Sequence, residues 1–152
     1  MTFTLRPATN SDVPALLPRS RALQDHEGIE ISDVALEQAM REMLANPNLG
    51  CVFVIDDDGR DVGYAFLSFS FDLEFGGREA WLTELFIDDA VRGRGAGAFT
   101  LAAIEPELRA RGVHASASSS VDLPAPFSPT KKVTRGSISS LPRVAIAGIE
   151  YG

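Results

Sequence analysis

The first part of the chain carries apolar residues in two spacings, one typical of strands and one typical of helices. Residues 3–6 predict a short first strand that Pro7 closes. Residues 10–23 predict a helix that Asn10 or Ser11 can cap and that Pro18 is expected to kink. A loop over residues 24–28 is expected to follow. The apolar face of this helix consists of Val13, Leu16, Leu17 and Leu23.

A second helix and three strands follow. Ser32 can cap the helix, whose apolar residues recur at i, i+4, i+7 and i+8, the spacing of one buried face. These residues are Leu36, Met40, Met43 and Leu44. Strands are expected over 51–55, 62–73 and 80–88, and Asp58-Gly59 is a dipeptide typical of a tight hairpin turn. The pattern therefore predicts an antiparallel meander.

A glycine-rich loop over 92–97 then leads into a third helix, which is expected to end at Gly112. Phe99, Ala102 and Ile104 are expected to face the core, whereas Pro106 costs ~3 kcal/mol or breaks the helix. Together these elements predict an α+β fold with helices around a mostly antiparallel sheet.

The last quarter of the chain differs in composition from the rest. Residues 1–112 hold ten Arg, no Lys and 19 acidic residues, whereas residues 113–152 hold both lysines and only two acids. Eight of the 13 serines also lie in this C-terminal segment. The segment is either a linker or appendage, or the product of a change of reading frame near His114. Two strands are expected in it, over 133–139 and 144–151.

Length and composition limit the class of protein. A chain of 152 residues with 45% hydrophobic residues predicts one globular domain, and one cysteine excludes a disulfide scaffold. No apolar run could span a membrane or serve as a signal peptide, so we expect a cytoplasmic protein. A net charge of −7 argues against nucleic acid and favours a cationic small molecule as partner.

The segment 92–97, Arg-Gly-Arg-Gly-Ala-Gly, carries the clearest chemical signal. Glycines let the backbone approach a ligand, and the N–H groups of the following helical turn point at an anion. Arg92 and Arg94 can add charge toward a phosphate. The alternative is a glycine-rich turn with two solvated arginines. The segment is neither a Walker loop nor part of a parallel dinucleotide-binding unit.

Here the sequence resembles the GCN5-related N-acetyltransferase (GNAT) superfamily, whose signature Arg/Gln-x-x-Gly-x-Gly/Ala matches Arg92, Gly95 and Gly97. The order of elements before the loop is also similar. Within the family, residues 63–97, the N-terminal LRPAT and the segment ALQDHEG look most like the diamine and polyamine acetyltransferases. The resemblance covers residues 3–112, which we interpret as an acetyl-CoA-binding core, with 113–152 as an atypical C-terminal segment of the same domain.

The resemblance implies acetyl-CoA as cosubstrate, bound by the loop amides and by the strand before the loop. The residues implied are Leu85, Phe86, Ile87, Arg92, Gly93, Arg94, Gly95, Ala96, Gly97 and Ala98. Glu84 matches an acidic position of the family and is the candidate base, because an amine must lose a proton to attack. Strict alternation places Glu84 on one face with Leu82 and Phe86. The alternative is a carboxylate at a bulge or in a structural hydrogen bond.

Four acidic residues could attract a small cationic amine. Asp25 and Glu27 lie in the loop expected after the first helix, and Asp72 and Glu74 flank the hairpin at Gly76-Gly77. Acidic loop residues are more often merely solvated. No metal site is expected, because the lone cysteine and the two histidines show no ligand spacing.

The C-terminal segment departs from the family, whose members continue with an Asn-x-x-Ala-x-x-x-Tyr helix that supplies a general acid. Neither Tyr64 nor Tyr151 matches that motif. The resemblance implies a small-molecule N-acetyltransferase, with a homodimer possible. A CoA-binding module without turnover and an interaction protein that has lost the site stay as alternatives.

Overall fold

The computed structural model describes residues 2–73, 76–113 and 145–146. The elements are β1 (Phe3–Pro7), η1 (Asn10–Asp12), α1 (Val13–His26), α2 (Asp33–Ala45), β2 (Gly50–Asp57), β3 (Arg60–Asp72), β4 (Gly77–Ile87), η2 (Asp89–Val91), α3 (Ala96–Ala110) and β5 (Ala145–Ile146). The sheet order is β1-β2-β3-β4-β5. The first four strands pair antiparallel and β5 pairs parallel with β4, so the predicted α+β fold with an antiparallel meander is confirmed.

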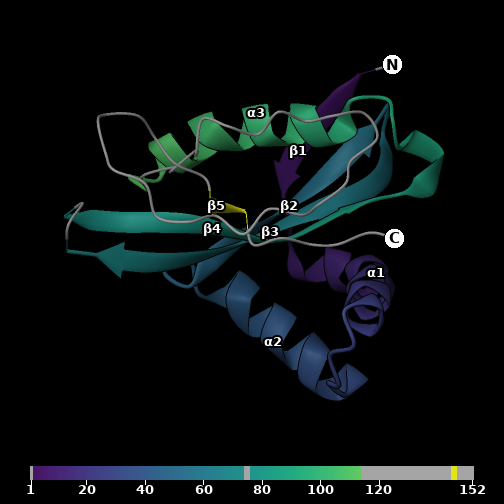
Figure 1. The fold of residues 1–152 in the computed structure, drawn as a ribbon, viewed down its shortest axis with the longest axis horizontal. Helices are drawn as coiled ribbons and strands as arrows, with labels where there is room; N and C mark the ends of the chain where they lie inside the picture. The colour runs from purple at the N-terminus through teal and green to yellow at the C-terminus, as the bar shows by residue number, and fades with distance from the viewer. Residues whose placement is uncertain (1, 74–75, 114–144, 147–152) are drawn as a thin grey trace.

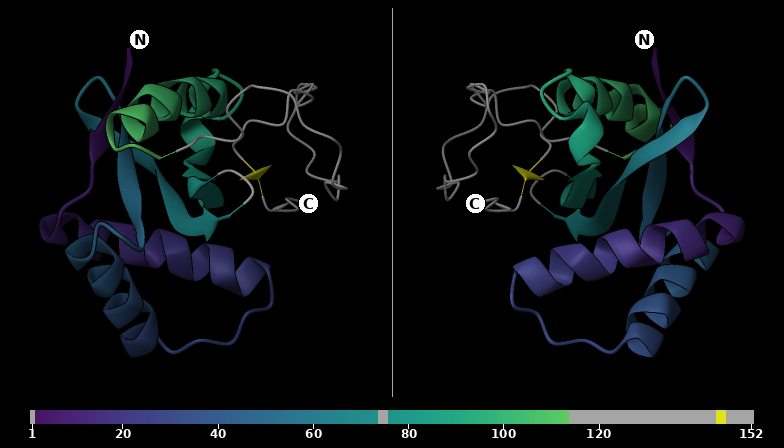
Figure 2. Two further views of the ribbon diagram at one scale, coloured as in Figure 1. Left: turned by 90° about the vertical axis from the view of Figure 1, so that its left-hand side faces the viewer. Right: turned by 90° about the vertical axis from the view of Figure 1, so that its right-hand side faces the viewer.

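The helices lie on both faces of the sheet (Figure 1). Helix α3 covers one face, and α1 and α2 cover the other, as the two views in Figure 2 also show. Both faces of the sheet are therefore apolar where a helix covers them. The buried cluster between α3 and the sheet includes Phe53, Leu82, Ile104 and Leu108, and the one between the sheet and α1 and α2 includes Val13, Leu16, Met40, Val54 and Tyr64.

Both helices that contain an internal proline continue through it. Helix α1 passes Pro18 and α3 passes Pro106, so of the two outcomes expected for Pro106, an energetic cost or a break, the break does not occur. A proline at position i removes the hydrogen bond to the carbonyl at i−4. For Pro106 that carbonyl belongs to Ala102, and both residues are exposed, so the carbonyl can reach solvent. The expectation that Ala102 faces the core is therefore also wrong, whereas Ile104 is buried as expected.

Helix α1 is longer than the sequence pattern indicated. It runs to His26, so Gln24 and Asp25 lie in its last turn and not in a loop. The reason is packing, because Leu23 and Gln24 are both buried. The expected caps differ as well: the helix begins after a 3-10 turn capped by Thr9, whereas Ser32 caps α2 as predicted and accepts a hydrogen bond from the amide of Ala35 at 3.2 Å.

The turn between β2 and β3 has the geometry that its dipeptide predicts. Asp58 and Gly59 both have positive φ, at 52° and 82°, which matches the twist of a two-residue hairpin. In the C-terminal segment, Ala145–Ile146 pairs with Trp81 and Leu82. The strand expected over 133–139 and the rest of that expected over 144–151 lie outside the described residues.

Candidate functional site

A β-bulge in β4 places Glu84. The register pairs Leu67 with Leu82 but Phe66 with Glu84, so Thr83 is an extra residue on β4. A bulge of one residue reverses the alternation of side chains beyond it. Leu82 packs under α3, whereas Glu84 contacts α1 on the opposite face. The expectation that Glu84 shares a face with Leu82 is therefore wrong, although Glu84 and Phe86 do lie on one face.

Three side chains donate hydrogen bonds to the Glu84 carboxylate. The Tyr64 hydroxyl donates to Oε2 at 2.7 Å and the Ser20 hydroxyl to the same oxygen at 3.2 Å. The Gln24 amide donates to Oε1 at 2.6 Å. Ser20 and Gln24 lie one turn apart on α1, and Tyr64 is fully buried on β3. The carboxylate therefore ties the end of α1 to the centre of the sheet.

The pKa of Glu84 is raised above its ordinary value. Burial is the main cause, because it disfavours the charged carboxylate. The hydrogen bonds from Tyr64, Ser20 and Gln24 act in the opposite direction, and the negative charge of Glu27 adds to the rise. A partly buried carboxyl with a raised pKa, under the electrostatic influence of a second acidic group, is suited to accept a proton near neutral pH.

An arginine on α1 fixes that helix against the site, and the sequence pattern did not reveal it. Arg19 forms ion pairs with Asp61 at 2.8 Å and with Asp88 at 3.0 Å. Asp61 lies near the start of β3, and Asp88 directly follows β4. Its guanidinium also lies 6.0 Å from the centre of the Phe86 ring, which stacks on Tyr64. Arg19 lies 42 residues from Asp61 and 69 residues from Asp88 in the sequence, so only the tertiary structure brings it to them.

The glycine-rich loop between η2 and α3 has the backbone shape of an anion cradle. Gly93 and Gly95 have φ of 74° and 86°, in the left-handed region that favours glycine. The first helical hydrogen bond of α3 runs from the amide of Phe99 to the carbonyl of Gly95 at 2.9 Å. The amides of Ala96, Gly97 and Ala98 precede it, so they have no intrahelical acceptor and point out of the helix start.

Both arginines of the loop are held by acidic neighbours. Arg92 pairs with Asp89 at 2.8 Å and donates from Nε to the carbonyl of Ile87 at 3.0 Å. Arg94 pairs with Asp57 at 3.1 Å. Part of each side chain stays exposed, so each cation lies beside the loop but shares its charge with a carboxylate.

The four acidic residues expected at the acceptor side lie in different places. Glu27 follows α1 directly and acts electrostatically on Glu84, whereas Asp25 pairs with Arg21 at 3.1 Å. Asp72 ends β3, six residues beyond the partner of Glu84 and therefore roughly 20 Å along the strand. Glu74 lies outside the described residues. The structure thus brings Glu27, but not Asp72, to Glu84.

The sequence matches one known protein family over most of its length. The family model of the acetyltransferase (GNAT) family matches residues 19–125, more than half of the chain. The chain belongs to the GNAT family. The matched range includes the Glu84 bulge, the glycine-rich loop and all of α3. No curated protein sequence matches this GNAT chain.

Solved structures share the fold. An integron cassette protein from the mobile metagenome of Cole Harbour Salt Marsh is 26% identical, with a TM-score of 0.68 and 91% of each chain covered. A predicted acetyltransferase with acetyl-CoA from Clostridium acetobutylicum is 24% identical, with a TM-score of 0.60, covering 74% of this chain and 77% of its own. A ribosomal-protein-alanine N-acetyltransferase from Brucella melitensis is 12% identical, with a TM-score of 0.60 and coverages of 74% and 75%.

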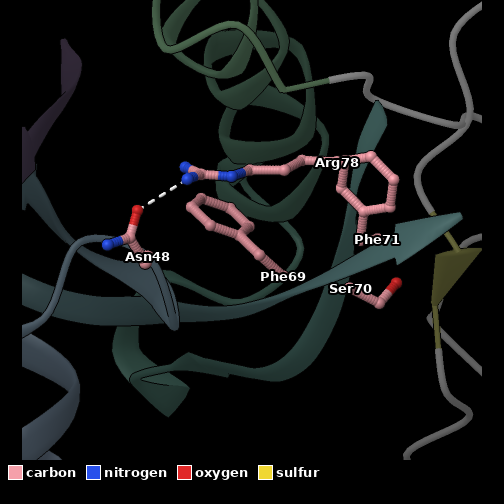
Figure 3. Close-up of a pocket in the computed structure, with 5 residues that line it drawn as sticks. All are labelled: Asn48, Phe69, Ser70, Phe71 and Arg78. Carbon is pink, nitrogen blue, oxygen red and sulfur yellow. Dashed lines mark hydrogen bonds between the residues drawn. The ribbon is translucent and has the colours of Figure 1, made fainter. Parts of the chain in front are cut away.

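Away from Glu84 and the glycine-rich loop, the described part of this GNAT fold offers a small cavity and a buried cysteine. A cavity of about 230 Å³ lies at the hairpin end of β3 and β4, away from Glu84, where Arg78 donates to Asn48 at 2.6 Å beside Phe69 (Figure 3). Burial raises the pKa of the Cys51 thiol to about 11, so this core cysteine is a poor nucleophile. Among the described residues no three acidic, histidine or cysteine side chains are grouped to hold a metal, and no helix could span a membrane.

Proposed function

We propose that this protein is an N-acetyltransferase that moves the acetyl group of acetyl-CoA to the primary amine of a small cationic molecule. The observation that carries the proposal is the position of Glu84, a partly buried carboxylate with a raised pKa on the strand that leads into the glycine-rich loop. Members of the GNAT family use acetyl-CoA, and one structural neighbour is described with it.

The loop and β4 have backbone groups that suit two parts of acetyl-CoA, the pyrophosphate and the pantetheine arm. Within the implied span 93–98, the amides of 96–98 suit a pyrophosphate, because they stand at the start of α3 where the helix dipole favours an anion, whereas the Arg94 amide donates to the carbonyl of Val91. The amides and carbonyls of Leu85, Phe86 and Ile87 suit the pantetheine arm, which can pair with them as a further strand would. Arg92 and Arg94 add positive charge beside the phosphates.

Glu84 acts as the base in this proposal. Acetyl-CoA supplies an activated thioester. Glu84 accepts the proton that the amine loses, the amine nitrogen forms a bond to the carbonyl carbon, and the carbon–sulfur bond breaks with its electron pair on sulfur. A backbone amide of β4 polarises the carbonyl oxygen. Positioned general bases contribute about 10²–10⁴-fold in rate, which sets the loss expected on removal of the carboxylate.

The acceptor side favours a cation. Glu27 acts electrostatically on Glu84, so an ammonium group entering there meets the negative charge of these two carboxylates, whereas the charge of the nearby Asp25 is shared with Arg21. A diamine or polyamine fits this pattern because it keeps a positive charge after one nitrogen is deprotonated. Asp72 and Glu74 would serve only an acceptor long enough to reach the hairpin end.

A second candidate is a CoA-binding protein without turnover. The three hydrogen bonds to Glu84 also suit a carboxylate whose only role is to fasten α1 to the sheet. In addition, the sequence after α3 lacks the tyrosine motif of the family. A homodimer stays a prediction, which the mass measured by light scattering would test.

One experiment separates these functions. Thermal unfolding is followed with and without acetyl-CoA, and release of free CoA thiol is then followed with a panel of diamines and polyamines. We expect stabilisation by acetyl-CoA and thiol release that falls about 10²–10⁴-fold in Glu84→Gln, with the stabilisation retained. Stabilisation without thiol release from any amine would favour the binding protein. No stabilisation would refute both.

A further inference from the structure

The hydrogen bonds of Glu84 distinguish its two oxygens. A carboxylate oxygen has two lone pairs and can accept two hydrogen bonds in good geometry. Oε2 already accepts two, from Tyr64 and Ser20, and both donors are buried. Oε1 accepts one, from Gln24. The oxygen with a lone pair still open is therefore Oε1.

The orientation of that open lone pair depends on Gln24. Its amide is the side-chain donor on Oε1, at 2.6 Å, and the residue is only 9% exposed in the last turn of α1. The same turn continues into Asp25 and Glu27, the acidic residues on the acceptor side. Helix α1 itself is held by the two ion pairs of Arg19. Gln24 thus links the acceptor side to the carboxylate through one short hydrogen bond.

We propose that Oε1 of Glu84 receives the proton of the acceptor amine and that Gln24 is the positioning residue that aims its open lone pair. This inference rests on the proposed function. In the step, the N–H bond of the amine breaks as the O–H bond to Oε1 forms, the nitrogen pair bonds to the thioester carbon, and the thiolate leaves with the electron pair of the C–S bond. The Gln24 side chain donates a hydrogen bond to Glu84 and neither gains nor loses a proton.

The charged and titratable groups around Glu84 determine how loss of the Gln24 hydrogen bond changes the pH dependence of the reaction rate. The Tyr64 hydroxyl donates to it from β3, and the Glu27 carboxylate, on the chain after α1, acts on it electrostatically. Gln24 is neutral, and its hydrogen bond favours the ionised carboxylate. Removing this bond disfavours ionisation, so the acidic limb of the rate profile moves to higher pH.

The test is Gln24→Met, which keeps the length of the side chain and removes the donor. The control is Gln38→Met, the same change at an exposed position of α2. For Gln24→Met we expect kcat to fall about tenfold, KM for acetyl-CoA to stay unchanged, and the acidic limb of kcat/KM to rise by about half to one pH unit. Carbon-13 titration of the Glu84 carboxyl should show the same rise. Gln38→Met should match the wild type in all four.

Two failures are distinguishable. If the wild type acetylates amines and Glu84→Gln abolishes this, but Gln24→Met behaves like Gln38→Met, the role of Gln24 is refuted and the proposed function stands. If the wild type releases no thiol with any amine while acetyl-CoA still stabilises it, the proposed function is refuted, and the role of Gln24 with it. A KM effect without a shift in pH profile would also overturn the proposal, since it would assign Gln24 to binding alone.

Discussion

Two glycines of the loop, Gly95 and Gly97, should respond differently to the same substitution. Gly95 lies at φ 86°, whereas Gly97 lies within the first turn of α3. An added Cβ meets no other heavy atom within 4 Å at either position. The difference between the two variants is therefore one of backbone conformation and not of space.

The magnitudes follow from that conformation. An L-residue in the left-handed region costs about 1–2 kcal/mol. In Gly95→Ala the loop either keeps its shape and carries this strain without ligand, or it relaxes to another shape and must take up the strain when acetyl-CoA binds. In both cases the free energy of unfolding in saturating acetyl-CoA falls by about 1–2 kcal/mol. Gly97→Ala adopts a helical φ without strain and restricts the unfolded chain, so stability should rise by about 0.4–1 kcal/mol.

The assay is urea unfolding of wild type and both variants, each without ligand and with acetyl-CoA at ~100 times its Kd, where the wild type gains ~2.7 kcal/mol. Gly97→Ala should keep this gain. Equal stability of liganded Gly95→Ala and liganded wild type would show that the loop does not need its left-handed residue. Loss of the ligand response in Gly97→Ala would show that the ligand lies closer to this turn than the backbone argument allows.

Two further predictions concern the attachment of α1. Arg19→Met should lower the free energy of unfolding by about 1–3 kcal/mol, because it leaves two partly buried carboxylates unpaired. The control Arg41→Met, at a half-exposed ion pair on α2, should change it by less than about 1 kcal/mol. Equal effects of the two variants in urea unfolding would contradict the role given to Arg19. The hydrogen-bonded pair with Arg6 is the main reason that the pKa of Asp12 is lowered, from about 3.8 to about 2. A lowered pKa means stability that is present above about pH 4 and is lost as pH falls toward 2, so Asp12→Asn should flatten this part of the unfolding profile, and an unchanged profile would refute the assignment.

The sequence pattern located the elements better than it located their faces. The strands, the hairpin turn at Asp58-Gly59 and the loop at 92–97 follow from local residue types, because turns and alternation depend on neighbours in the chain. Glu84 was recognised as a candidate base, yet its face was predicted wrongly. The bulge at Thr83 depends on how β4 pairs with β3, which alternation within one strand does not contain.

The prolines illustrate the same limit. The local rule predicts that Pro106 either destabilises α3 by ~3 kcal/mol or breaks it. Whether the helix breaks depends on where the freed carbonyl points, and here it belongs to an exposed residue, Ala102. Burial of Ile104 and Leu108 against the sheet holds the helix together on its other side. Tertiary packing therefore outweighs the local cost.

By itself, the sequence determined the order of the elements, the α+β class and the glycine-rich loop of a GNAT fold, since each depends on residue types close together along the chain. Only the tertiary structure decided the surroundings of Glu84. Its partners Ser20, Gln24 and Tyr64 lie 64, 60 and 20 residues away in the sequence. A carboxylate acquires its pKa and its orientation from groups within hydrogen-bonding distance, and folding rather than sequence order determines which groups those are.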